Sequence, residues 1–271
     1  MGFFSWLFKR SKPKKIKMGI ALGSGGAKGF AHLGVLKALE ENGISFDYIA
    51  GTSIGSIVGA CVAQGYSSTD IFELLKTFTD MTDVKNIFML NTSVLAKVLD
   101  NQLGSVNFEE MKKPFKAVAT ELDTGKEHVF DKGNVAMALC ASSSMQPYFK
   151  PVVIDGVRYI DGAYTNSIPA DVVKDMGADY IIGVDLSTRE QKPSIISKIF
   201  PTYKSNVKEP WAKGYKFSNL TLHPDLSGYT SVSISSSNQM FDIGYNCAMK
   251  AMPQIIEEIN ALTYGKKTKK K

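Results

Sequence analysis

A serine stands between two glycines in the pentapeptide Gly51-Thr52-Ser53-Ile54-Gly55. The short apolar run at residues 47–50 precedes it, and small and apolar residues continue at helical spacing to residue 64. This pattern predicts a nucleophile elbow, a sharp turn from a strand into a helix that exposes the serine oxygen. Glycine is needed on both sides because strand and helix come too close there for larger side chains. The pentapeptide also arises by chance, so its surroundings decide how it is interpreted.

The segment before the elbow has the same strand-to-helix order. Residues 18–22 predict a buried strand, Gly23-Ser24-Gly25-Gly26 predicts a loop, and the apolar residues after it predict a helix that ends at Asn42-Gly43. Two successive strand–helix units are typical of a parallel sheet covered by helices. We therefore expect an α/β fold.

The same kinds of element continue along the rest of the chain. We predict helices at 69–100, 135–141, 170–176 and 231–262, the last as one long helix or two. We predict strands at 115–121 and 127–130, joined as a hairpin, and at 152–154, 157–160 and 180–186.

Composition divides the chain into a body and two ends. We expect one domain over residues 17–263, with 231–262 as its C-terminal helical segment, a leader at 1–16 and a basic tail at 264–271. Residues 187–230 are polar and contain four prolines, which predicts an irregular insertion or a lid.

Positive charge is concentrated at the two ends of the chain. The chain carries a net charge of +6, but residues 9–17 hold six Lys or Arg and residues 266–271 hold five Lys, with no acid in either segment. The body between them therefore has a net charge of −5. Because the basic residues belong to the ends and not to a face of the domain, we expect no nucleic-acid partner.

The leader places Phe3, Phe4, Trp6 and Phe8 before its basic residues. A secretory signal has the opposite order, and no apolar run reaches the ~18 residues of a membrane-spanning helix. The leader is either disordered or docked on its own domain, or it is an interfacial anchor. In the last case, residues 1–17 and 264–271 bind anionic lipid. We expect a cytoplasmic protein, either free or peripheral on the inner face of the membrane.

The glycine-rich loop at residues 23–29 can bind an anion through its backbone N–H groups. A dinucleotide fingerprint fails because Lys28 takes its sixth position, and a phosphate-binding P-loop fails because Gly29 follows that lysine. An oxyanion hole needs only two convergent donors, which Gly25 and Gly26 can supply; a tight turn without function is the alternative. We expect no cofactor. The three cysteines are widely separated, so we expect reduced thiols and no metal site.

A nucleophilic serine requires a base, and the chain has three histidines. His32 falls on a predicted helix and His128 in a predicted hairpin strand. His223 lies in the polar segment, and Ser53, Asp161 and His223 occur in the chain order of an α/β-hydrolase triad. Asp161 is the stronger candidate because it ends a predicted strand and precedes two small residues that let another backbone approach closely.

Three motifs in order carry a resemblance to a known family. Gly25-Gly26-Ala27-Lys28-Gly29, Gly51-Thr52-Ser53-Ile54-Gly55 and Asp161-Gly162-Ala163 resemble the signatures of the patatin-like phospholipases, particularly small bacterial members. Similar flanking residues at 30–36, 143–152 and 166–169 extend the likeness over residues 17–186. Ser24 stands where this family often has glycine, and Lys28 where many members have arginine.

The resemblance implies a three-layer α/β/α sandwich with a mainly parallel central sheet, related to lysophospholipases. It implies a Ser53–Asp161 dyad without histidine and an oxyanion hole at Gly25 and Gly26. The implied activity is hydrolysis of fatty-acyl esters of phospholipids or lysophospholipids through an acyl-enzyme. We expect a desolvated site, since a carboxylate with an ordinary pKa near ~3.9 is a weak base for a hydroxyl.

Further residues are expected to support this site: Lys28, Gly51, Gly55, Gly162 and Asn166. Of these, Asn166 is expected to orient the loop after Asp161 by hydrogen bonds. Two alternatives remain open. One is an esterase that uses His223 as the third member of a triad, and the other is a lipid-binding protein of the same fold without catalysis.

Overall fold

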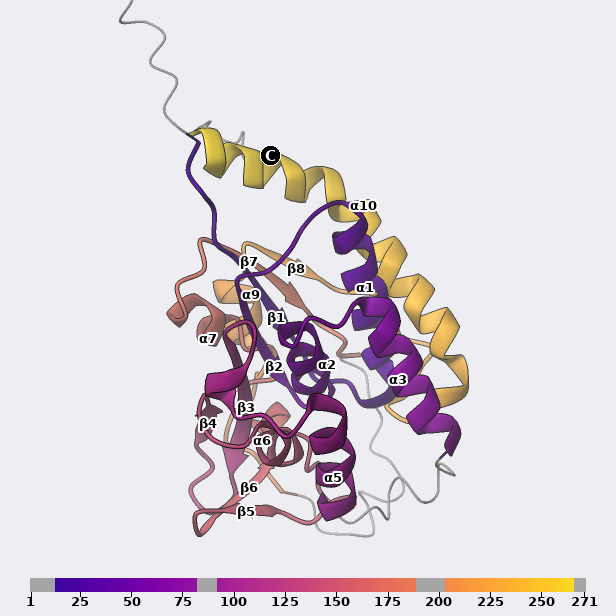
Figure 1. The fold of residues 1–271 in the computed structure, drawn as a ribbon, viewed down its shortest axis with the longest axis vertical. Coiled ribbons are helices and arrows are strands. Elements are labelled where there is room, and N and C mark those ends of the chain that lie inside the picture. Colours follow the sequence, from indigo (N-terminus) through magenta and orange to yellow (C-terminus); the bar gives the residue numbers. More distant parts are fainter. Residues whose placement is uncertain (1–12, 82–91, 189–202, 266–271) are drawn as a thin grey trace, which may run out of the picture.

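The computed structural model describes residues 13–81, 92–188 and 203–265, with an eight-stranded sheet at its centre (Figure 1). The strand order is β5-β6-β3-β2-β1-β7-β8, and β4 pairs with β3. The strands are β1 Met18–Leu22, β2 Tyr48–Thr52, β3 Phe115–Glu121, β4 Glu127–Phe130, β5 Val152–Ile154, β6 Val157–Asp161, β7 Tyr180–Val184 and β8 Leu220–Leu222.

The helices follow or separate these strands. The α-helices are α1 Phe30–Glu41, α2 Ile54–Ala63, α3 Ser68–Met81, α5 Thr92–Leu103, α6 Val135–Ser142, α7 Ala170–Asp175, α9 Ala212–Phe217 and α10 Ser237–Tyr264. The short 3-10 helices are η1 Gly26–Gly29, η2 Phe108–Glu110, η3 Gly162–Tyr164 and η4 Ile234–Ser236.

The five neighbouring strands from β3 to β8 run parallel, and β4, β5 and β6 add antiparallel pairings at one side of the sheet. Helices cover both faces: α7 and α9 on one, and α1, α2 and α6 on the other (Figure 1). Successive side chains of β1 point to opposite faces of the sheet. Ile20 and Leu22 therefore belong to the larger hydrophobic core and Ala21 to the smaller one. The predicted α/β class with a mainly parallel sheet is confirmed.

The longest helix, α10, packs along α1. A Cβ atom added to Gly34 would lie 1.9 Å from the Phe241 carbonyl oxygen, and one added to Gly244 would meet the backbone of α1 equally closely. The two backbones are therefore in direct contact. Phe72 of α3 joins them through edge-to-face contacts with Phe30 and Phe241, each at a centroid distance of 5.4 Å.

Residues 203–230 are more regular than the predicted insertion. The strand β8 extends the sheet beside β7, with Ile182 opposite Leu220, and α9 packs next to it. The predicted lid spans residues 187–230, of which 189–202 lie outside the described residues, so the lid stays a prediction. Most of the leader and nearly all of the basic tail also lie outside the described ranges.

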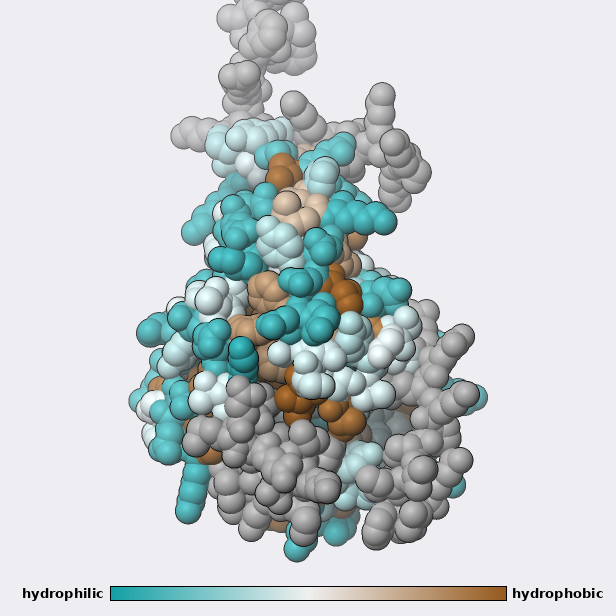
Figure 2. All heavy atoms as spheres, turned by 90° about the vertical axis from the view of Figure 1, so that its right-hand side faces the viewer, coloured by the Kyte–Doolittle hydropathy of each residue, from teal (hydrophilic) through white to brown (hydrophobic). Residues whose placement is uncertain are grey.

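The C-terminal segment forms one long helix after η4 instead of two, with Pro253 inside it. Figure 2 shows the side of the molecule that lies to the right in Figure 1, where hydrophilic side chains alternate with small groups of hydrophobic ones. Among the described helices, none combines the length and apolar character needed to cross a bilayer.

Candidate active site

The pentapeptide around Ser53 forms the predicted turn from strand to helix. The strand β2 ends at Thr52, and α2 begins at Ile54. Ser53 between them has φ 56° and ψ −129°, a conformation that is strained for a residue with a side chain. Gly51 is required by the sharpness of this turn, because a Cβ atom there would lie 2.2 Å from the Gly55 carbonyl oxygen.

Two more glycines bring the elbow against the glycine-rich loop. A Cβ atom on Gly55 would lie 2.1 Å from the Leu22 carbonyl oxygen at the end of β1. A Cβ atom on Gly29 would lie 2.3 Å from the Ile54 side chain. The first turn of α2 can therefore rest directly on the loop that follows β1.

Strand β3 brings Asp161 to Ser53. One edge of β3 pairs with β2 as far as Val118, which lies opposite Thr52. From Ala119 onward the same edge pairs with the antiparallel strand β6, and Ala119 lies opposite Asp161. The edges are the same because β4 pairs with Val118 and Ala119 from the other side. The ends of β2 and β6 therefore meet.

Ser53 and Asp161 are in direct contact. The Ser53 hydroxyl donates a hydrogen bond to Asp161 Oδ2 at 2.6 Å. The other carboxylate oxygen, Oδ1, accepts the Ala163 N–H at 2.8 Å. Burial raises the pKa of the Asp161 carboxyl to about 7, although these two hydrogen bonds act in the opposite direction. A carboxylate in this setting is a better proton acceptor than an exposed one.

Two hydroxyl side chains that sequence reasoning missed hold the backbone of this pair. Ser142 accepts the Ser53 N–H at 2.9 Å and donates to the Val118 carbonyl oxygen at 2.6 Å. Thr120 donates to the Asp161 carbonyl oxygen at 3.0 Å. Neither residue belongs to a recognisable sequence pattern, because its partners come from other elements.

The glycine-rich loop is anchored on both sides of the Gly25 and Gly26 amides. Among the described residues, no acceptor contacts the N–H groups of Gly25 and Gly26. Their neighbours Gly23, Ser24 and Ala27 donate to the carbonyl oxygens of Val184, Ser167 and Ser231, respectively. Gly26 has φ +59°, and a Cβ atom on it would lie 2.6 Å from the Ser231 oxygen. The loop can therefore present two backbone donors to a developing negative charge.

Lys28 lies on η1 behind this loop and is buried. Its ammonium donates to Thr188 Oγ1 at 3.3 Å. Burial lowers the pKa of Lys28, and the charge of Asp185 opposes this shift. The structure thus places the side chain of Lys28 in the interior behind the loop.

The three histidines lie at other places. His223 Nδ1 is 3.2 Å from Asp185 Oδ2. Burial alone would raise the pKa of Asp185, but hydrogen bonds from His223 and other groups bring it down to about 2. His32 is held neutral by burial, which lowers its pKa to about 4, and its Nε2 lies 2.7 Å from the Gly23 carbonyl oxygen. His128 Nδ1 lies 3.5 Å from Glu121 Oε1. The carboxylate that His223 contacts is therefore not Asp161.

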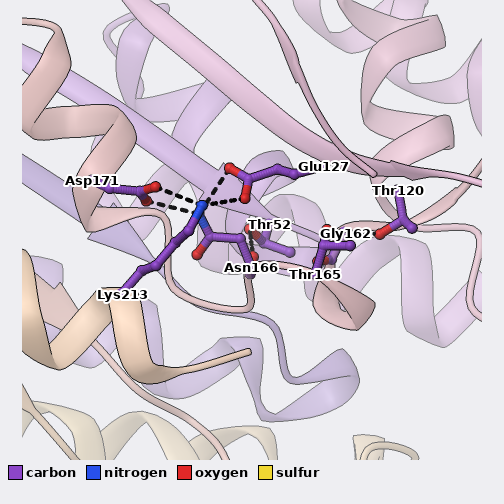
Figure 3. Close-up of polar contacts among 8 residues, drawn as sticks. All are labelled: Thr52, Thr120, Glu127, Gly162, Thr165, Asn166, Asp171 and Lys213. Atoms are coloured by element: carbon purple, nitrogen blue, oxygen red, sulfur yellow. Dashed lines mark hydrogen bonds and ion pairs between the residues drawn. The ribbon is translucent and has the colours of Figure 1, made fainter. Parts of the chain in front are cut away.

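The loop after Asp161 is fixed by Gly162 and Asn166 (Figure 3). A Cβ atom on Gly162 would lie 2.2 Å from the Val118 carbonyl oxygen. The Asn166 N–H donates to the Gly162 carbonyl oxygen at 2.9 Å, and the Asn166 carbonyl oxygen accepts the Thr52 hydroxyl at 2.8 Å. Asn166 is thus bonded to the neighbour of each member of the Ser53–Asp161 pair.

Residues 20–174 match the protein family described as patatin-like phospholipase. The patatin-like phospholipase domain-containing protein 7 of Mus musculus is 33% identical over 189 residues, which cover 64% of this chain and 14% of that protein. An uncharacterised NTE family protein of Mycobacterium bovis is 34% identical over 188 residues, which cover 66% of this chain and 51% of that protein. The chain spans no more than about half the length of these relatives.

Two solved structures of low sequence identity share the fold. VipD from Legionella pneumophila has a TM-score of 0.52 and 13% identity, over 89% of this chain and 67% of that chain. Human GIVD cytosolic phospholipase A2 has a TM-score of 0.51 and 10% identity, over 92% of this chain and 60% of that chain. At these identities the likeness concerns the arrangement of sheet and helices alone.

Proposed function

We propose a lipid-ester hydrolase, because the chain belongs to the patatin-like phospholipase family. In this proposal the chain is a serine acyl hydrolase that cleaves fatty-acyl esters of phospholipids or lysophospholipids. The observation that carries it is the 2.6 Å hydrogen bond from Ser53 Oγ to Asp161 Oδ2. A serine hydroxyl on a sharp strand-to-helix turn that donates to a buried carboxylate of raised pKa is the arrangement that an activated nucleophile requires.

Acylation begins when Ser53 Oγ attacks the ester carbonyl carbon and its proton passes to Asp161 Oδ2. The tetrahedral intermediate collapses by breaking the bond to the alcohol oxygen, which takes the proton from Asp161. In the second half, water attacks the acyl-enzyme and gives a proton to Asp161. The fatty acid leaves as that proton returns to Ser53 Oγ.

The amides of Gly25 and Gly26 stabilise the negative oxygen of both tetrahedral intermediates. The support for this role is that neither N–H donates within the described residues, while the residues around them are firmly anchored. Loss of one donor in such a site typically costs ~10²- to 10³-fold in rate.

The first prediction tests the Ser53–Asp161 pair. Ser53→Ala and Asp161→Asn each lower turnover of a short p-nitrophenyl ester on the order of 10⁴-fold or more, because each removes one half of the proton transfer. His223→Ala keeps its turnover, because His223 contacts Asp185 instead. The measurement is initial rate by absorbance, together with labelling of Ser53 by a fluorophosphonate.

Other outcomes would favour the alternatives. An inactive His223→Ala protein that remains folded would favour a triad. An unlabelled Ser53 and an inactive wild-type protein would favour a lipid-binding protein without catalysis. Mass-spectrometric profiling of products from mixed lipids, with Ser53→Ala as control, then identifies the head group and the acyl position.

An anionic membrane surface is the proposed partner of the two basic segments, residues 1–17 and 264–271. The Lys14 N–H donates to the Thr263 carbonyl oxygen at 3.0 Å, so the two segments adjoin the same end of the domain. These two segments carry eleven positive charges, which favour binding to anionic lipid over neutral lipid.

A further inference from the structure

Two carboxylates and one ammonium meet at the side chain of Asn166 (Figure 3). Glu127 begins β4, Asp171 lies on α7 and Lys213 lies on α9. Lys213 Nζ is 2.8 Å from Asp171 Oδ2 and also contacts Glu127 Oε2. We call these three residues and Asn166 the Lys213 cluster.

Asn166 closes this cluster from the opposite side. Its Nδ2 donates to Glu127 Oε1 at 3.0 Å and to Asp171 Oδ1 at 2.7 Å. Each carboxylate therefore gives one oxygen to the amide and the other to the ammonium. The Asn166 side chain is buried, and its Oδ1 has no partner among the described residues. Within the part of the chain that the structure describes, the two carboxylates hold the orientation of this amide.

The charge of Lys213 is what lets the two carboxylates share a site. The side chains of Glu127 and Asp171 are only 19% and 18% exposed, so water screens their mutual repulsion weakly. Burial by itself lowers the pKa of Lys213, but the hydrogen bonds to Asp171 and Glu127 raise it above its ordinary value. An uncharged side chain at position 213 would leave two negative groups facing one amide.

The backbone of Asn166 connects the cluster to the reacting groups. Its carbonyl oxygen is bonded to Thr52, which precedes Ser53, and its N–H to Gly162, which follows Asp161. The same loop supplies the Ala163 N–H that holds Asp161 Oδ1. A shift of the loop would therefore move the carboxylate relative to the Ser53 hydroxyl.

We propose that Lys213 is a positioning residue for Asp161: it holds Glu127 and Asp171 together, they fix Asn166, and the loop 162–166 fixes the carboxylate. This inference rests on the proposed function. Lys213 also lies outside residues 20–174, the part that matches the family. The segment after β7 thus contributes to the geometry of a pair that lies in the matched part.

The second prediction tests this role with Lys213→Met, which removes the charge and keeps a long side chain. The kcat for a p-nitrophenyl ester falls by about 10- to 100-fold, because displacement of a reacting group by about an ångström has an effect of this size. The KM stays unchanged, because Lys213 touches no substrate in this scheme. Lys213→Arg restores most of the kcat, because a guanidinium can contact both carboxylates.

The matched control is Lys216→Met on the same helix. Lys216 is exposed, its ammonium lies 5.1 Å from the centre of the Phe217 ring, and among the described residues it forms no ion pair with Glu127 or Asp171. We expect wild-type kcat for this variant. An equal loss of kcat in Lys213→Met and Lys216→Met, or a wild-type kcat in Lys213→Met, would overturn the proposal.

A second measurement does not depend on activity. Hydrogen exchange of the peptide that contains residues 162–166 is faster in Lys213→Met than in the wild type or in Lys216→Met. Unchanged exchange would overturn the proposal, and Lys213→Gln serves in both assays if Lys213→Met does not fold. A wild-type protein without Ser53-dependent turnover would instead refute the proposed function, and the exchange result alone would then decide whether Lys213 holds the loop.

Discussion

At the scale of single residues, the site depends on what burial does to one carboxyl group. Asp161 is completely buried, its Oδ1 is occupied by the Ala163 N–H and its Oδ2 by the Ser53 hydroxyl. Burial disfavours the charged form more than these two bonds favour it, which is why the pKa is raised to about 7. The same property that makes Asp161 a stronger base also makes it partly protonated at neutral pH.

The third prediction concerns this titration. Because the ionised form of Asp161 accepts the Ser53 proton, kcat/KM is constant at alkaline pH and falls as the pH drops through about 7. The folded-state pKa lies above the ordinary value, so ionisation of Asp161 also removes stability as the pH rises towards 7. The measurement is kcat/KM from pH 5 to 9, with the rate of fluorophosphonate labelling as a second readout. A flat profile in a protein that stays folded would contradict it.

At the scale of helices and strands, α1 and α10 pack with their backbones in direct contact. Gly34 allows it, since the nearest atoms to an added Cβ are backbone atoms of Phe241 and Tyr245, at 1.9 and 2.6 Å. Backbone atoms cannot move aside as a flexible side chain can. The two helices would have to separate, which would also disturb the Phe72 contacts that bind α3 to both.

The fourth prediction is that Gly34→Ala lowers the free energy of unfolding by about 1–3 kcal/mol, the usual range for overpacking. Alanine favours a helix by at most about 1 kcal/mol over glycine, so the crowding decides the sign. Urea unfolding measures the change. Lys37→Ala on the same helix is the control, since it removes only the Lys37–Glu41 pair. A Gly34→Ala protein as stable as the wild type would show that the helices separate at no cost.

Elements with a complete local pattern could be predicted from the sequence. The predicted ranges 18–22, 115–121 and 127–130 coincide with β1, β3 and β4. The strand β8 could not be predicted, because three residues are too few for an alternating pattern and its pairing with β7 defines it. The predicted helix over 69–100 is described as two helices, α3 and α5, and residues 82–91 between them lie outside the described residues.

Some residues of the site could be predicted from the sequence and others could not. Ser53, Asp161 and the glycines could be named because each belongs to a short motif, and the family match confirms the resemblance that those motifs carry. Their contact, 108 residues apart in the chain, was not visible in the sequence without that resemblance. Ser142 and Lys213 could not be found at all, since their partners lie on other strands and helices. The catalytic role of the pair stays a prediction.

At the scale of the whole molecule, the two basic segments join the domain away from the Ser53–Asp161 pair. The strands β1 and β2 begin near Lys14 and Thr263 and end at the glycine-rich loop and the elbow. The Lys14–Thr263 contact therefore lies at the end of the sheet where these strands begin, whereas Ser53 lies where β2 ends. Contact of the two basic segments with a membrane would tether the domain at the end away from the Ser53–Asp161 pair. The cytoplasmic location stays a prediction.

The fifth prediction tests this tether. The protein sediments with vesicles that contain phosphatidylserine and less with neutral vesicles, and added salt weakens the binding. Deleting residues 1–12 reduces it, while the contacts of Lys14 are kept. Sedimentation after the deletion is compared with that of Ser53→Ala, which retains both segments. Binding that is equal with and without residues 1–12 would refute a role for the leader.

Because β2 and β6 share one edge of β3, the Ser53–Asp161 pair can form only late in synthesis. Ser53 leaves the ribosome long before Asp161, and until β6 pairs with residues 119–121 of β3 no carboxylate faces the serine hydroxyl. Lys213 follows later still. A growing chain therefore carries a serine that has no partner carboxylate until β6 has joined the sheet.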